Sequence, residues 1–285
     1  MEIKASQVKE LRDMSGVAMM ECKRALVECE GDLEKALDLL RSNSSLKAEK
    51  KSSRVAADGV IRIVSSDSYA TIIEINSETD FAAKDPGFIA FADDVVNYVS
   101  NNKVDDISMF ASTEIEEKRL ALIQKIGENI QLRRMETIEF DNSMSVGSYM
   151  HSDGKLATLV VTSNSDDNLA KDVAMHVAAS NPLCKTPDDI DSEVLEREKA
   201  IFEVQAKESG KDDEIMSKMV EGKVRKFLAE VSLTSQAFIK DPDMTVGKLL
   251  SDNGADVTGY VRFKVGEGIE VETKSFADEV ADQLK

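Results

Sequence analysis

The first 43 residues place hydrophobic side chains at helical spacing in three short stretches, which glycine residues separate. Val8 and Leu11 lie three positions apart in the first stretch, and the pattern recurs over 19–29 and 33–40. We therefore predict a module of three helices over 1–43. Because so few apolar side chains build only a marginal core, a docking module is the favoured interpretation.

The chain after this module is polar and basic. Residues 42–45 are Ser-Asn-Ser-Ser, and 47–54 contain four basic side chains. Such a composition favours a solvated tether, so we predict a linker over 44–55. A binding patch for an anionic partner stays open as the alternative.

From residue 56 the hydrophobic period becomes that of β-strands, and one pattern occurs twice. Residues 59–77 and 147–165 each contain two β-rich runs joined by a polar turn, which is typical of a β-hairpin. A helical pattern and a further strand candidate follow each hairpin: 88–99 and 129–135 after the first, 169–178 and 257–265 after the second.

The simplest account of this repetition is an internal duplication. We predict an α+β fold with two duplicated subdomains built on antiparallel sheets, one at 56–140 and one at 141–181 together with 228–263. Chance similarity of two short hairpins is the alternative.

Two helical segments lie outside this repeat. Residues 182–227 predict an inserted helical hairpin of the coiled-coil kind, with apolar positions on both arms. A homodimer contact through this hairpin and packing of its helices back on the domain both stay open. In the C-terminal module, 264–285, Phe276, Val280 and Leu284 recur every four residues and predict an amphipathic helix.

Charge and composition exclude several classes of protein. The formal net charge is −18, so the surplus of Lys and Arg that drives direct nucleic-acid binding is lacking. There is no apolar run of 18 residues, and the opening residues are charged, so we expect no membrane partner. Three cysteines without a Cys-x-x-Cys pair fit a reducing, cytoplasmic location.

Catalytic and cofactor motifs are lacking in the sequence. The two histidines, His151 and His176, have neither triad nor metal-ligand spacing, and His176 is interpreted as a structural histidine. The stretch 254–260 has Tyr260 where a phosphate-binding loop needs Lys. We expect no metal, no cofactor and no catalytic chemistry.

One segment does not fit a purely structural interpretation. Residues 77–87 follow a predicted strand and place the carboxylate of Asp80 beside the aromatic ring of Phe81. The ordinary alternative is a helix cap at Thr79 or Asp80 with Phe81 in the core.

The string Glu-Ile-Asn-Ser-Glu-Thr-Asp-Phe-Ala-Ala-Lys at 74–84 closely resembles the signature of the elongation factor Ts family. Residues 11–32 resemble that family's ubiquitin-associated-like (UBA-like) module. Shorter strings at other positions resemble it in the same order: 56–59, 125–129, 175–180 and 265–268. The family usually has Val where this chain has Ala82, which removes two methyl groups beside Phe81.

The resemblance implies a guanine-nucleotide exchange factor for elongation factor Tu, active in the elongation step of protein biosynthesis. It would bind the GDP form and the nucleotide-free form, and would promote GDP release by dislodging Mg²⁺ and loosening the phosphate site. On this resemblance the residues that dislodge Mg²⁺ are Thr79, Asp80, Phe81 and Ala82. The further contact positions that it implies are Lys23, Ile126, Gly127, His151, Phe238 and Ile239.

Two other classes stay open at this stage. A UBA-like adaptor would use the three N-terminal helices as its main binding surface. An enzyme of unknown chemistry would need a pocket with converging titratable groups and would bury Phe81 away from the surface.

Overall fold

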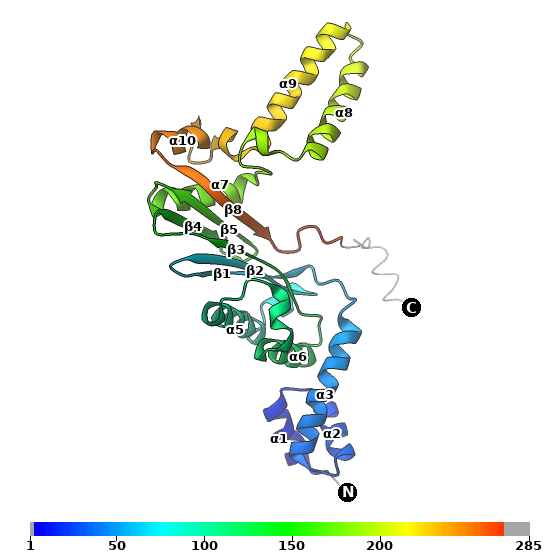
Figure 1. The fold of residues 1–285 in the computed structure, drawn as a ribbon. Coiled ribbons are helices and arrows are strands. Elements are labelled where there is room, and N and C mark those ends of the chain that lie inside the picture. The colour runs from blue at the N-terminus through cyan, green and yellow to red at the C-terminus, as the bar shows by residue number, and fades with distance from the viewer. Residues whose placement is uncertain (1–2, 271–285) are drawn as a thin grey trace. The chain divides into compact units, whose positions relative to one another are not determined.

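The computed structural model describes residues 3–270 and contains both helices and small sheets, which confirms the α+β prediction (Figure 1). The described residues divide into two compact units. One comprises 3–64, 73–136 and 264–270, and the other comprises 65–72 and 137–263. This division is coarser than the segments expected from the sequence, whose boundaries, apart from those of the linker, stay a prediction.

Three helices form the N-terminal bundle, as predicted: α1 (Ala5–Ser15), α2 (Met19–Glu28) and α3 (Leu33–Lys51). Gly16 ends α1 in the left-handed conformation, at a φ of 69°, where a side chain would be strained. The Asp32 side chain begins α3 by accepting a hydrogen bond from the Lys35 N–H at 3.1 Å. The small core contains Leu11, Leu26 and Leu40.

The prediction of a tether after this bundle is wrong, because 42–51 are helical and belong to α3. The small side chains of Ser44 and Ala48 are buried, and α3 packs along α6 (Glu114–Ile126). Lys51 also donates a hydrogen bond to the Gly127 carbonyl. Polar composition suggested solvation, but close packing of small residues stabilises a helix here.

The first sheet has the order β1-β2-β3, formed by β1 (Asp58–Ser65), β2 (Tyr69–Ser77) and β3 (Gln131–Glu139). The short helix α4 (Asp80–Ala83), α5 (Pro86–Asn102), the 3₁₀ helix η1 (Ile107–Ser112) and α6 connect β2 to β3. β2 is buried along its length. Gly59, at a φ of 145°, lets β1 approach β2, because a Cβ there would collide with the Ile75 carbonyl.

The second sheet repeats this order with β4 (Met144–Met150), β5 (Leu156–Ser163) and β8 (Asp256–Lys264). β4 pairs with β5 in the antiparallel sense, with Gly147 opposite Val160. The helix α7 (Asp167–Ser180) packs on both strands, and a Cβ on Gly147 would collide with the backbone of Ala170 in α7. Hairpin, helix and late third strand thus recur in the order that the duplication predicts.

Between α7 and β8 the chain forms the predicted helical hairpin of α8 (Ser192–Glu208) and α9 (Asp213–Val231). The ring centroids of Phe202 and Phe227 lie 6.3 Å apart across the hairpin. The remaining elements are η2 (Pro187–Asp189), η3 (Leu233–Ser235), β6 (Ala237–Phe238), β7 (Asp241–Thr245) and α10 (Val246–Asp252). The C-terminal helix predicted from Phe276, Val280 and Leu284 lies outside the described residues.

Candidate functional site

The turn that follows β2 presents an aromatic side chain to solvent. β2 ends at Ser77, and α4 begins at Asp80 with Thr79 as its N-cap. The Thr79 hydroxyl oxygen accepts a hydrogen bond from the Ala82 N–H at 3.2 Å, so the helix cap of the ordinary alternative is present at Thr79. Phe81 is 82% exposed, so the alternative that places its ring in the core is wrong.

The side chains on either side of Phe81 have different environments. Asp80 accepts a hydrogen bond from the ammonium group of Lys84, one helical turn away, at 2.7 Å. This hydrogen bond and the negative charge of Asp80 raise the pKa of Lys84. Ala82 is buried and anchors α4, so the turn exposes an ion pair and an aromatic ring over a buried methyl group.

Two carboxylates hold this turn to the segment that follows α6. Glu128 accepts two hydrogen bonds from Thr79, one from the N–H at 3.0 Å and one from the hydroxyl at 2.7 Å. In the opposite direction, Glu78 accepts a hydrogen bond from the Asn129 N–H at 2.6 Å. We call Glu78, Thr79, Glu128 and Asn129 the carboxylate clasp.

The carboxylate clasp brings Ile126 and Gly127 near the predicted Mg²⁺-dislodging residues 79–82. Gly127 ends α6 at a φ of 89°, and its N–H donates to the Ile123 carbonyl. Both Ile126 and Gly127 are half-buried. Six of the ten predicted site residues therefore lie within or directly beside the clasp.

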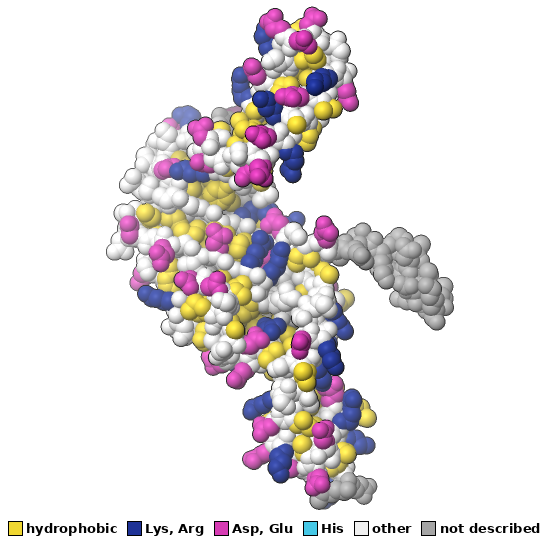
Figure 2. Space-filling model, turned by 45° about the vertical axis from the view of Figure 1, so that its right-hand side comes forward, with side chains coloured by type: hydrophobic (Ala, Val, Ile, Leu, Met, Phe, Trp, Pro, Cys, Tyr) yellow, Lys and Arg dark blue, Asp and Glu magenta, His cyan; other side chains and the backbone are white. Residues whose placement is uncertain are grey.

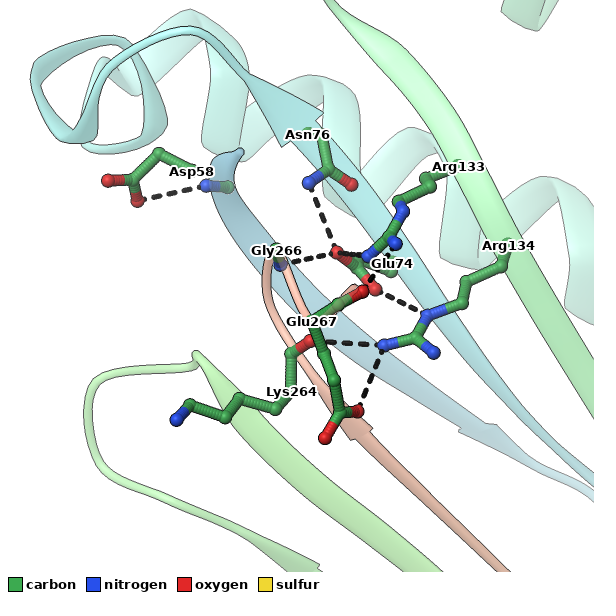
Figure 3. Close-up of polar contacts among 9 residues, drawn as sticks. Asp58, Glu74, Asn76, Arg133, Arg134, Lys264, Gly266 and Glu267 are labelled. Carbon is green, nitrogen blue, oxygen red and sulfur yellow. Dashed lines mark hydrogen bonds and ion pairs between the residues drawn. The ribbon is translucent and has the colours of Figure 1, made fainter. Parts of the chain in front are cut away.

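Another carboxylate of the same unit is fully buried on β2 (Figure 3). Glu74 lies 2.9 Å from the Arg133 guanidinium and 2.6 Å from that of Arg134. It also accepts hydrogen bonds from the Gly266 N–H at 2.8 Å and the Asn76 amide at 3.1 Å. Burial acts to raise the pKa of Glu74, but these hydrogen bonds outweigh it and leave the pKa below its ordinary value.

The same arginines hold the backbone that follows β8. Arg134 donates to the Lys264 carbonyl at 3.0 Å, and Arg133 donates to the Glu267 carbonyl at 2.5 Å (Figure 3). This network fixes 264–267 against β2 and β3. We call Glu74, Arg133, Arg134 and Gly266 the buried network.

Two further predicted contact residues are Lys23 in the first unit and His151 in the second. Lys23 is exposed on α2, where it lines a shallow hollow together with Met20, Arg24, Val27 and Glu28. His151 is 49% exposed in the turn after β4, with its Nδ1 atom 2.9 Å from the Asp153 carboxylate.

Phe238 and Ile239 differ in burial although they are neighbours. Phe238 is 5% exposed in the core of the second unit, whereas Ile239 is 46% exposed. The Nδ1 atom of His176 accepts the Ile239 N–H at 3.2 Å, so its Nε2 carries the proton and donates to Gln236 at 2.9 Å. Burial lowers the pKa of His176, and the Gln236 hydrogen bond offsets this in part. His176 is therefore a structural histidine, as predicted.

The hydrogen-bond partners that shape the carboxylate clasp and the buried network are not predicted from the sequence. Glu128 and Asn129 fall within a string that resembles the family, but no spacing rule pairs them with Glu78 and Thr79, about 50 residues earlier. The pairing of Glu74 with Gly266 spans an even longer stretch of chain. Apart from the family resemblance of the strings that contain these residues, the available signal was runs of polar residues at strand exits.

Within 3–270, no three His, Cys, Asp or Glu side chains are grouped in a way that could bind a metal ion. None of the helices over the same residues is long and apolar enough to cross a membrane.

Comparison with known proteins shows one family throughout. The family model described as Elongation factor TS matches residues 78–267. The chain is 51% identical over 285 residues to Elongation factor Ts of Hahella chejuensis, covering 99% of each chain. It is 50% identical to Elongation factor Ts of Saccharophagus degradans, with 100% of this chain and 98% of that protein covered. With Elongation factor Ts of Francisella tularensis subsp. novicida it shares 48% identity over 99% of each chain.

Proposed function

This chain belongs to the elongation factor Ts family and is a translation elongation factor, and we propose that it promotes release of GDP from elongation factor Tu. The observation that carries this proposal is the 82% exposure of Phe81 at the signature turn. A large aromatic side chain left in water by a folded protein is typical of a residue that a partner buries. The proposed partner of this chain is elongation factor Tu, in the GDP-bound and nucleotide-free forms.

In the proposed mechanism, Asp80 and Phe81 enter the partner beside its bound Mg²⁺. The metal neutralises much of the charge of a nucleoside diphosphate, so displacing it weakens the phosphate site. Burial of the Phe81 ring supplies the driving energy, because an aromatic side chain buries about 150–250 Å². In the free protein the Asp80 carboxylate forms an ion pair with Lys84. Once this ion pair breaks, the carboxylate weakens the binding of the metal by the partner.

No acid, base or nucleophile is needed for this function. If the factor lowers the affinity of its partner for GDP, then GDP lowers the affinity for the factor by the same ratio. The ternary complex is thus transient, and release is faster while the overall nucleotide equilibrium is unchanged. We propose that this chain has no catalytic chemistry and needs no cofactor.

The remaining predicted contacts are proposed to widen the interface. Lys23, His151 and Ile239 are accessible for direct contact. Phe238 is buried, so it would act by supporting Ile239. Ile126 and Gly127 would contact the partner beside the carboxylate clasp. Because the net charge of −18 disfavours binding to phosphates, we propose no direct nucleic-acid partner. We also propose no membrane partner and a cytoplasmic location.

The helical hairpin is the proposed site of a homodimer contact. Hydrophobic side chains are exposed on it between charged ones (Figure 2). Ile201, Val204 and Ile215 are exposed hydrophobic residues of its two helices. Sedimentation of the protein and of an Ile201→Glu variant tests this contact. A dimer that the variant dissociates supports it, whereas a monomeric parent protein contradicts it.

The exchange function is tested by the release of a fluorescent GDP analogue from elongation factor Tu in the presence of Mg²⁺. We expect strong acceleration by this protein and loss of most of it with Phe81→Ala. Met109→Ala, which truncates another exposed apolar side chain of the same unit, is the matched control and should retain the activity. No acceleration by the folded parent protein would refute the proposed function.

A further inference from the structure

We propose that Glu128 is a positioning residue for nucleotide exchange, which holds the Thr79 turn in the conformation that presents Phe81 to the partner. This inference rests on the proposed function, because it assigns a role in the same site. Glu128 does not need to touch the partner or the nucleotide for this role.

The helix α4 is too short to be stable by itself. A helix of four residues contains too few internal hydrogen bonds to offset the cost of nucleation, so its conformation depends on outside contacts. Phe81 is 82% exposed, so its ring contributes little packing to fix the turn. The direction of Phe81 therefore depends on the cap at Thr79 together with the buried Ala82 beside it.

Glu128 accepts a hydrogen bond from each of the two donor groups of Thr79. One carboxylate oxygen accepts the Thr79 N–H, and the other accepts the hydroxyl proton. Because the hydroxyl proton is directed to Glu128, a lone pair of the same oxygen is left to accept the Ala82 N–H. Glu128 thereby orients the cap that starts α4.

The segment that carries Glu128 is held by contacts of its own. Asn129 is buried, and its side-chain amide donates to the Arg54 carbonyl at 2.8 Å. Its N–H is held by Glu78, which also lies 3.4 Å from the Arg54 guanidinium. The turn with Phe81 is thus attached to a segment that is itself fixed.

The contact uses the charge and both oxygens of the carboxylate. A glutamine at 128 keeps one acceptor oxygen for the Thr79 N–H, but its NH₂ group then faces the Thr79 hydroxyl, which has to rotate and accept that hydrogen bond. Glu128→Gln therefore replaces two charge-assisted hydrogen bonds by two weaker neutral ones, and Glu128→Ala loses both. Each change lowers the fraction of molecules in the presenting conformation and raises the apparent dissociation constant by the same factor.

The test measures release of the fluorescent GDP analogue from elongation factor Tu at increasing concentrations of each full-length variant. For Glu128→Ala we expect the half-maximal concentration to rise about tenfold, with a smaller rise for Glu128→Gln. The maximal rate should stay near that of the parent protein, because saturation selects the presenting conformation. Glu117→Gln, which removes an exposed charge from α6, is the control and should match the parent protein.

A second readout needs no partner. Hydrogen exchange of the amides of 79–83 in the free protein should be faster in Glu128→Ala, while amides of β2 keep their protection. A general loss of protection would indicate a merely structural role and overturn the proposal. Adding Glu128→Ala to Phe81→Ala should raise the half-maximal concentration much less than tenfold, since the presented ring is gone.

The outcomes separate this inference from the proposed function. If the parent protein does not accelerate release, the proposed function fails, and the positioning role fails with it. If the parent protein and Glu128→Ala have the same half-maximal concentration, only the positioning role of Glu128 is refuted.

Discussion

Glu74 and Glu128 make the same kind of contact in two environments. Each carboxylate accepts a backbone N–H from a distant part of the chain, Gly266 for Glu74 and Thr79 for Glu128, at 2.8 and 3.0 Å. Glu74 is fully buried between two arginines, whereas Glu128 is only half-buried beside an exposed turn.

The difference in burial separates stability from function. Removing one member of a buried ion pair leaves the charge of the other without a counter-charge in a region of low dielectric, which lowers the free energy of unfolding. Near the surface, water forms hydrogen bonds with the groups that lose their protein partner, so the free energy of unfolding changes little. The buried network should therefore hold the first unit together, while the carboxylate clasp decides only where Phe81 points.

The largest expected effect comes from Glu74→Ala. It removes the carboxylate that Arg133, Arg134 and the Gly266 N–H share, while the arginines keep their backbone carbonyl acceptors. We expect it to lower the free energy of unfolding by about 3 kcal/mol. Because the chain has no Trp, unfolding is best followed by calorimetry or circular dichroism. A loss below about 1 kcal/mol would erase the contrast with Glu128.

Gly266→Ala attacks the other side of the same contact. Gly266 has a φ of 74°, and a Cβ there would collide with the Ala57 carbonyl. We expect a loss of about 2 kcal/mol from backbone strain and weakening of the Glu74 hydrogen bond. Thermal unfolding measures this loss of stability. Gly210, also at positive φ but in open space, offers the control Gly210→Ala, which carries the strain without the collision.

The stabilisation by Glu74 should depend on pH in one direction. Its pKa is lowered in the folded state, so the unfolded chain binds the proton more readily. The stabilisation is then complete above the unfolded pKa of about 4.3 and is lost as the pH falls through the folded pKa. Measured from pH 7 to pH 3, the difference in unfolding free energy between the parent protein and Glu74→Gln should shrink below about pH 4. A constant difference would contradict this assignment.

Glu128→Ala should lower the free energy of unfolding by at most about 1 kcal/mol, because water replaces Glu128 as the acceptor for Thr79. Urea unfolding monitored by circular dichroism measures this change. A loss as large as that of Glu74→Ala would show that the carboxylate clasp supports the fold and not only the turn.

The smallest change in stability is expected for the residue with the largest expected role in exchange. Phe81→Ala removes a side chain that is 82% exposed, so the free energy of unfolding should stay within about 0.5 kcal/mol of the parent value. The same thermal and urea measurements apply. A loss of more than about 2 kcal/mol would mean that the ring packs in the free protein after all.

Local patterns were sufficient where neighbours in the chain decide the structure. The three N-terminal helices, the two hairpins and the inserted helical hairpin follow from hydrophobic spacing and from caps such as Asp32 and Thr79. The tether was predicted wrongly because Ser44 and Ala48 have little helical pattern of their own and are buried only through tertiary packing of α3.

By itself, then, the sequence determined the fold class, the order of the elements and the segment that carries the family signature, because hydrophobic period and local capping are properties of neighbouring residues. Tertiary structure alone decided that Phe81 is exposed while Phe238 is buried, since burial depends on what the rest of the chain covers. It alone also paired Glu74 with Gly266 and Glu128 with Thr79. A hydrogen bond between distant segments leaves no periodic trace in the chain, so only folding brings its donor and acceptor together.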